Sequence, residues 1–180
     1  MTRWVIAAGI AAGIAGHSAA WAQNATSVGS TPPAAAVGLV DSTGKVAARP
    51  FNDTIMVITI SGGVTAPALI RPIYDPDRHM ASGLATWHSG GTVLFTSSDC
   101  TAGAHVYSLP HAGVRAAAQV QTTSGIILHV GAIGPATTVA IRSILYDTGC
   151  APVTVRQSGL FPVVTTVNLT TAYPPPLSFQ

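Results

Sequence analysis

Charged side chains are scarce in this sequence. It contains no glutamate and a single lysine, Lys45, and charged residues make up only 8% of its 180 residues. The formal net charge is +2. Proteins that bind nucleic acid carry clustered Lys and Arg side chains, so this composition argues against a nucleic-acid partner. The hydrophobic content of 48% excludes a wholly disordered chain, which would be poor in apolar residues and rich in charge.

The N-terminal segment has the three parts of a secretory leader. A positive start, Met1–Arg3, precedes the uncharged apolar run Trp4–Ala15 and the small-x-small sequence Ala20–Ala22. These parts in this order are typical of a signal peptide. We predict that residues 1–22 are a signal peptide, that Gln23 becomes the N-terminus, and that the protein is exported to the periplasm or the extracellular space.

Long apolar runs are absent from the rest of the sequence. The leader's apolar run is itself shorter than the roughly 20 residues that cross a bilayer core of ~30 Å. No later stretch offers about 18 uninterrupted apolar residues. We therefore expect no membrane span after cleavage. A retained N-terminal anchor or a buried helix is the alternative reading of the leader.

Composition predicts the fold class. Val, Ile and Thr account for 47 of the residues from Gln23 onward, whereas the usual surface residues of helices are missing. With 18 Gly and 13 Pro in the whole chain, turn signals recur at the spacing of short strands. We predict an all-β protein: residues 23–36 form a flexible Ser/Thr/Pro/Ala tail, and residues 37–180 form a single antiparallel β-sandwich or barrel-like domain with one disulfide.

Several strands can be placed from local pattern. Residues 41–45 (DSTGK) predict a hairpin turn, because Gly supplies positive φ and Asp41 can bond back to the turn. Residues 54–60 are apolar on both faces, which favours a central strand covered on both sides. Residues 64–73 contain two prolines, which favours an edge strand. Residues 74–91 lack any period and predict a long surface loop, with a short strand at 84–87.

The C-terminal third predicts three further strands. Residues 136–147 form the longest candidate, in which Val139, Ile141, Ser143 and Leu145 share one face. Residues 153–156 and 163–169 predict two shorter strands, separated by a turn at Ser158–Gly159. The proline run 174–176 is expected to end the pattern.

The two cysteines, Cys100 and Cys150, predict one disulfide. In an exported protein an even cysteine count indicates pairing, and both residues follow predicted strands. The rival readings are a metal pair or a redox pair, and neither has the close spacing of a CxxC motif. We therefore expect a structural bond without a redox role.

The sequence around the cysteines resembles a group of secreted bacterial and phage-associated β-rich domains of uncharacterised function. The resemblance rests on residues 94–107 (LFTSSDCTAGAHVY), which are similar to an aromatic-x-Ser-x-Asp-Cys-Thr-Gly signature, on residues 39–46 (LVDSTGKV) and on residues 146–150 (YDTGC). Ala102 is an extra residue before Gly103. The resemblance implies a β-rich secreted domain with a second, C-terminal cysteine, and it implies no activity.

No catalytic constellation is visible in the sequence. Gly-x-Ser-x-Gly does not occur, and paired-carboxylate chemistry would have to use Asp alone. No two histidines stand at the spacings that place metal ligands on one strand or helix face. We therefore predict no catalytic residue, no metal and no cofactor. A site that joins distant residues stays an open alternative, with its place in the loop that contains Asp75, Asp77, His79 and His88.

Three classes of function remain. The favoured hypothesis is a non-catalytic exported domain with a structural or contact-forming role, whose partner is a cell-envelope or extracellular protein or glycan. The alternative is a module that binds a glycan or small ligand through the 74–91 loop, with Tyr74, Trp87 and His88 as candidate ligand-binding residues. The third is an enzyme or metalloprotein whose residues come together only in the fold.

Overall fold

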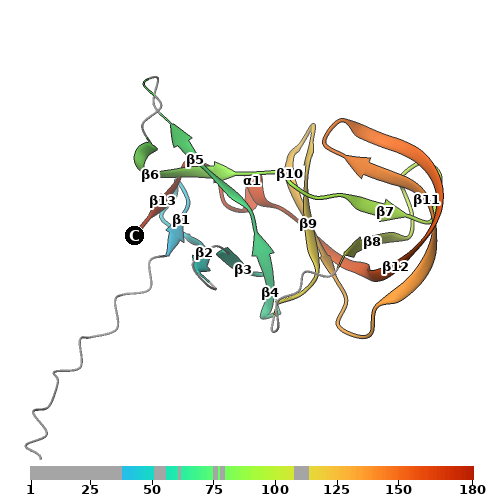
Figure 1. Cartoon of the computed structure of the whole chain (residues 1–180). Helices are drawn as coiled ribbons and strands as arrows, with labels where there is room; N and C mark the ends of the chain where they lie inside the picture. Colours follow the sequence, from blue (N-terminus) through green and yellow to red (C-terminus); the bar gives the residue numbers. More distant parts are fainter. Residues whose placement is uncertain (1–37, 51–55, 61, 75–76, 78–79, 108–113) are drawn as a thin grey trace, which may run out of the picture. The chain divides into compact units, whose positions relative to one another are not determined.

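The structure is a computed structural model that describes residues 38–180, with the exception of residues 51–55, 61, 75–76, 78–79 and 108–113 (Figure 1). The predicted signal peptide and tail therefore lie outside the described residues. All described residues belong to one unit, Pro33–Gln180. Almost all of its regular structure is strand, which confirms the all-β prediction.

Thirteen strands and one helical turn occur in the described residues. They are β1 (Leu39–Val40), β2 (Val46–Pro50), β3 (Met56–Ile60), β4 (Val64–Ala68), β5 (Ile70–Tyr74), β6 (Met80–Trp87), β7 (Val93–Phe95), β8 (Ala104–Tyr107), β9 (Ala117–Thr122), β10 (Gly125–Gly131), β11 (Thr137–Tyr146), β12 (Gly149–Asn168), α1 (Leu169–Ala172) and β13 (Leu177–Phe179).

The strands form two antiparallel sheets. The first has the order β4-β3-β2-β1-β13-β6-β5, and the second has the order β11-β7-β8-β12-β10-β9. An additional β11–β12 pairing closes β11, β7, β8 and β12 into a ring of hydrogen-bonded strands, which is visible where β11 and β12 curve around β7 and β8 (Figure 1). The predicted sandwich or barrel thus has features of both.

The first hairpin has the predicted chemistry. Asp41 Oδ1 accepts hydrogen bonds from the backbone N–H groups of Thr43 and Lys45, at 2.8 and 3.0 Å, and Gly44 has a φ of +83°. The Thr43 hydroxyl also donates to Asp41, and this bond is the main reason why the pKa of the Asp41 carboxyl lies below its ordinary value. A turn with so many local bonds is readable from sequence because its partners are all within four residues.

The proline-containing segment lies at sheet edges, as predicted, but it is split in two. Pro67 belongs to β4 and Pro72 to β5, and these strands are the opposite edges of the first sheet. The prediction for the preceding strand was wrong in one respect. Ile58 and Ile60 are buried in β3, but Thr59 is exposed, so this strand is covered on one face only.

The interpretation of residues 74–91 as a long loop was also wrong. Residues 80–87 form the eight-residue strand β6, which contains the short strand predicted at 84–87 and pairs with β5 on one side and with β13 on the other. The β5–β6 register shifts near Gly83, which has a φ of +74°, so this glycine marks an irregularity in the pairing of the two strands. Pairing on both sides, with the neighbouring β5 and the distant β13, makes this part of the segment a strand.

The C-terminal third contains two more corrections. The two strands predicted at 153–156 and 163–169 are parts of one strand, β12, of 20 residues. Gly159, with a φ of +77°, lies at a bulge where the β11–β12 register shifts, and the strand continues through it. The proline run does not end the fold, because β13 follows it and lies between β1 and β6.

Two hydrophobic cores share the β9–β10 pair. Ile126, Leu128 and Val130 of β10 pack with residues of the first sheet, such as Leu39 and Ile58. The other core joins β7, β8 and β12 to β9, through Ala118 and Val120. A smaller third cluster contains Leu94, Ile141 and Leu160 inside the ring.

Candidate functional site

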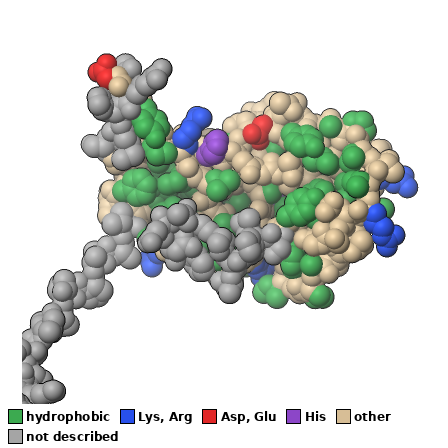
Figure 2. Space-filling view, viewed as in Figure 1, with side chains coloured by type: hydrophobic (Ala, Val, Ile, Leu, Met, Phe, Trp, Pro, Cys, Tyr) green, Lys and Arg blue, Asp and Glu red, His purple; other side chains and the backbone are tan. Residues whose placement is uncertain are grey.

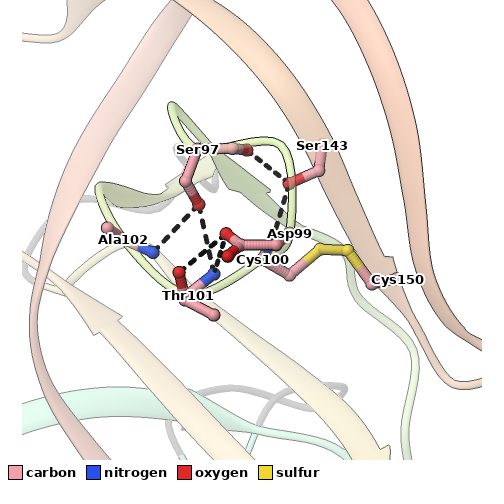
Figure 3. The surroundings of a disulfide bond; sticks show 7 residues. All are labelled: Ser97, Asp99, Cys100, Thr101, Ala102, Ser143 and Cys150. Atoms are coloured by element: carbon pink, nitrogen blue, oxygen red, sulfur yellow. Dashed lines mark hydrogen bonds between the residues drawn. A yellow bond between two sulfur atoms is a disulfide. The ribbon is translucent and has the colours of Figure 1, made fainter.

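The segment that follows β7 forms the predicted disulfide. The Cys100–Cys150 bond joins two residues whose Cα atoms are 6.0 Å apart, and no free cysteine is present (Figure 3). Neighbouring strands bring the two cysteines together: Cys150 of β12 stands opposite Leu145 of β11, and the loop after β7 places the Cys100 N–H against Ser143, two residues along β11. This confirms the disulfide.

Side chains hold the loop around Cys100 independently of the sulfur atoms. The Ser97 hydroxyl oxygen accepts hydrogen bonds from the backbone N–H groups of Thr101 and Ala102, at 3.1 and 3.0 Å. Ser143, fully buried in β11, donates its hydroxyl to the Ser97 carbonyl at 2.7 Å and accepts from the Cys100 N–H at 3.0 Å (Figure 3). The residues of the signature motif therefore build a loop rather than a reactive site.

Asp99 belongs to the same local network. Its carboxylate accepts the Thr101 hydroxyl at 2.7 Å, and this bond is the largest cause of a pKa below the ordinary value for Asp99. Gly103 faces Thr96 so closely that a Cβ at this position would lie 1.9 Å from the Thr96 hydroxyl oxygen. The Asp, Thr and Gly of the motif are thus explained by the geometry of the loop.

The three predicted ligand-binding residues do not come together. Trp87 is only 5% exposed, and its indole N–H donates to the Tyr173 carbonyl at 2.9 Å, so its ring belongs to the core and cannot stack on a ligand at the surface. Tyr74 is 58% exposed, but it is far from Trp87. Trp87 pairs with Ile70 of β5, and Tyr74 lies four residues farther along that strand, or about 13 Å from Ile70 at ~3.3 Å per residue. His88 is exposed beside Trp87.

The described residues contain no group of three or more side chains suited to hold a metal ion. His88, His105 and His129 lie on different elements, and the candidate residues Asp75 and His79 lie outside the described part of the chain.

A shallow depression of about 450 Å³ lies between the β6–β7 connection and the turn after β11. Gly90 and Gly91 line one side, and Tyr146 and Asp147 line the other. Asp147 joins the two, because its carboxylate accepts the Ser89 hydroxyl at 2.6 Å and the Gln121 N–H at 2.8 Å. The depression thus offers a half-exposed aromatic ring beside hydroxyl and carboxylate groups.

The outer face of β11 and β12 is a second exposed surface. Arg156 of β12 stands opposite Ala140 of β11, and Arg142 lies two residues farther along β11, at a shift of the β11–β12 register. Both are exposed, and Figure 2 shows Lys and Arg side chains over this part of the second sheet. An adjoining hollow of about 560 Å³ includes Arg142, Pro152 and Thr154.

His129 of β10 has a buried imidazole. In the register it stands between Ala118 of β9 and Thr166 of β12, neither of which is charged. Neither ring nitrogen has a hydrogen-bond partner among the described residues. Burial therefore lowers the pKa of His129 from 6.5, because the cationic form is poorly solvated there.

We predict that this histidine makes the protein less stable in mild acid. Its folded pKa is lower than its unfolded pKa of about 6.5, so the unfolded state binds the proton more tightly. The contribution of neutral His129 to the free energy of unfolding is therefore fully present above about pH 6.5 and is lost as the pH falls through the folded pKa. Urea midpoints measured between about pH 7.5 and 5 should fall for the wild type and stay flatter for His129→Leu. His88→Leu, at an exposed histidine, is the control and should keep the wild-type slope; equal slopes for all three proteins would refute the assignment.

Three residues of interest could not be recognised from the sequence. Gln119 is buried in β9, and Arg115 lies half-buried in a cavity before that strand. His129 of β10 is half-buried, and both of its ring nitrogens are buried. Strand alternation does not distinguish Gln119 from the exposed Gln121 two residues later.

No known protein family, curated protein or solved structure matches this chain. The described residues contain no helix that is long and apolar enough to cross a membrane.

Proposed function

We propose that the chain is an exported, non-catalytic β-domain protein that makes contacts at the cell envelope or outside the cell. The observation that carries this proposal is the Cys100–Cys150 disulfide. Such bonds persist in oxidising compartments and are rare where thiols are kept reduced. The leader predicted from residues 1–22 supports the same compartment.

The outer face of β11 and β12 is the contact surface in this proposal. The turn end of this long ribbon is tied by the disulfide to the loop after β7. A ribbon held in this way presents its side chains at fixed positions, so little conformational entropy is lost on binding. Arg142 and Arg156 are exposed and supply positive charge on a chain that has few charges. Arginine is enriched among the residues that dominate binding energy at interfaces.

The mass of the intact protein, measured after cell fractionation, tests the proposal of export directly. The full chain expressed in a bacterial host is expected outside the cytoplasm as a species that begins at Gln23 and contains no free thiol. A cytoplasmic protein that keeps residues 1–22 and both thiols would refute the proposal of export.

We predict that charge reversal on the contact surface weakens binding to the envelope. The double variant Arg142→Glu/Arg156→Glu replaces two attractive charges with two repulsive ones, so its bound fraction in cosedimentation with envelope preparations should fall several-fold. The matched control is Arg49→Glu/Arg71→Glu, which makes the same charge change at exposed positions of the first sheet. Equal losses for the two variants, or no binding by the wild type, would refute this surface.

Glycan binding is the second candidate function, and the depression beside Tyr146 favours it. Sugars bind in shallow polar sites where an aromatic ring contacts their apolar face. Here Tyr146 is 39% exposed, and Asp147 supplies acceptor oxygens next to it. This site shares only its glycine side, Gly90 and Gly91, with the 74–91 segment chosen from sequence. A glycan array probed with the exported protein supports the candidate if binding saturates, and rejects it if no glycan binds.

A further inference from the structure

A cavity of about 480 Å³ lies where four separate segments of the chain meet. The β3–β4 turn and the start of β4 form one wall, and the segment before β9 forms another. The β10–β11 connection and Phe161 of β12 complete it. Its volume is within the range of about 300–1,000 Å³ that is typical of small-molecule sites.

Arg115 is the one charged residue among the described residues that line this cavity. Its backbone is fixed, because the Arg115 N–H donates to the Thr65 carbonyl of β4 at 3.2 Å. Among the described residues its guanidinium makes one long contact, 3.5 Å, with the Gly131 carbonyl. A guanidinium has five N–H donors, and this contact engages one of them.

No carboxylate of the described residues neutralises this cation. Asp41 is engaged with Thr43 and Lys45, Asp99 with Thr101, and Asp147 with Ser89 and Gln121. The fourth described aspartate, Asp77, is exposed between β5 and β6. A cation that is partly withdrawn from water without a counter-charge is unfavourable, and an anionic ligand would relieve that cost. Arginine also matches the planar carboxylate group with two parallel hydrogen bonds.

The rest of the lining is largely apolar. Val64, Val114 and Phe161 contribute aliphatic and aromatic surface, and Ile133 stands at the rim with 80% of its surface exposed. This is the most exposed large hydrophobic side chain among the described residues. An apolar group that bound against Ile133 would remove this surface from water, at about 25 cal/mol per Å².

Glycine turns keep the mouth of the cavity open. Gly63, with a φ of +74°, and Gly134, with a φ of +141°, have no atom within 4 Å of the place where a Cβ would stand. At these two positions of the lining, therefore, no side chain narrows the cavity.

We propose that this cavity binds a small molecule in which a carboxylate is attached to an apolar body. The carboxylate pairs with the Arg115 guanidinium, and the apolar body lies against Ile133 and Phe161. The site shares no residue with the β11–β12 contact surface, so the two proposals stand or fall separately.

The experiment is an NMR titration of the exported protein with 4-phenylbutyrate and with its neutral analogue, 4-phenylbutyramide. The two probes have nearly the same shape, so their difference in affinity reports the charge. We expect saturable shifts of the amide signals of Val64, Arg115 and Ile133, and at least tenfold tighter binding of the acid. The substitution Arg115→Gln should weaken binding of the acid at least tenfold and leave binding of the amide unchanged.

Two further variants separate this result from general effects of charge or folding. Arg156→Gln removes the same charge at an exposed position and should bind the acid like the wild type. Ile133→Ser should weaken the binding of the acid and of the amide by similar factors, because this substitution removes only apolar contact. The proposal is wrong if the acid and the amide bind with equal affinity, or if Arg156→Gln weakens binding of the acid as much as Arg115→Gln does. It is also wrong if the shifted amide signals belong to residues away from the cavity. Absence of saturation up to about 10 mM would refute it as well, because any dissociation constant well below that concentration would be detected.

Discussion

Replacing both Cys100 and Cys150 with serine is expected to lower the free energy of unfolding by about 4 kcal/mol, because the bond closes a loop with a sequence separation of 50 residues. The closed loop contains β8, β9, β10 and β11 and therefore restricts a large part of the unfolded chain. For a domain of this size the melting temperature should fall by roughly 8–16 °C.

The double variant should nevertheless fold. Ser97, Asp99 and Ser143 hold the loop through hydrogen bonds that do not involve sulfur. The control is the wild type melted with reductant, which should match the serine variant, because the more accessible partner, Cys150, is exposed. A reductant that leaves the melting temperature unchanged, although thiol titration shows both cysteines reduced, would contradict a stabilising role for this bond.

Local chemistry explains which features were predictable from the sequence. The hairpin at residues 41–45 depends on Asp41, Thr43 and Gly44, which are neighbours in the chain. The faces of β11 follow from alternation, and Ile141 and Ser143 are indeed buried while Arg142 is exposed. The disulfide followed from cysteine count and compartment. For the hairpin and the faces of β11, the sequence within a few residues carries the information, whereas two cysteines allow only one intramolecular pairing.

Features that depend on distant partners were not predictable. The sequence of residues 74–91 predicts a loop, because Pro76, the glycines and the lack of a period are local signals. One of the two partners of β6 is β13, which lies about 90 residues later in the chain. The same pairing explains Trp87. Its indole N–H needs the Tyr173 carbonyl, and this contact turns a presumed surface aromatic into a core residue.

The cavity around Arg115 illustrates the same limit for function. Its lining comes from four chain segments, and none of them carries a recognisable motif. A lone arginine before a strand is usually a solvated surface residue. Only the fold shows that Arg115 stands in a cavity without a carboxylate beside it among the described residues.

Gln119 is the residue for which we expect the largest effect of a single substitution on stability. It is 1% exposed, and its side chain reaches from β9 of the second sheet to the first. Its amide oxygen accepts the Leu69 N–H, and its amide nitrogen donates to the Leu69 carbonyl at 3.2 Å and to the His88 carbonyl at 3.0 Å. Leu69 connects β4 to β5 and His88 follows β6, so this one side chain ties two points of the first sheet to β9.

Replacing Gln119 with leucine keeps the approximate volume and removes all three bonds. The Leu69 N–H then loses its acceptor, whereas the Leu69 carbonyl still accepts the His88 N–H at 3.0 Å. We expect a loss of about 2–3 kcal/mol, because leaving a buried donor unsatisfied costs more than an average hydrogen bond contributes. The urea midpoint should fall while the m-value stays unchanged, since the same surface is exposed on unfolding.

The matched control is Gln121→Leu, two residues along the same strand. The Gln121 side chain is exposed, and its amide nitrogen donates only to the neighbouring Thr122 carbonyl at 2.8 Å. The free energy of unfolding of Gln121→Leu should stay within about 0.5 kcal/mol of the wild-type value, the usual range for a surface substitution. If Gln119→Leu also stays within that range, water or backbone movement satisfies the Leu69 N–H, and the two sheets are held together by their apolar core rather than by this amide.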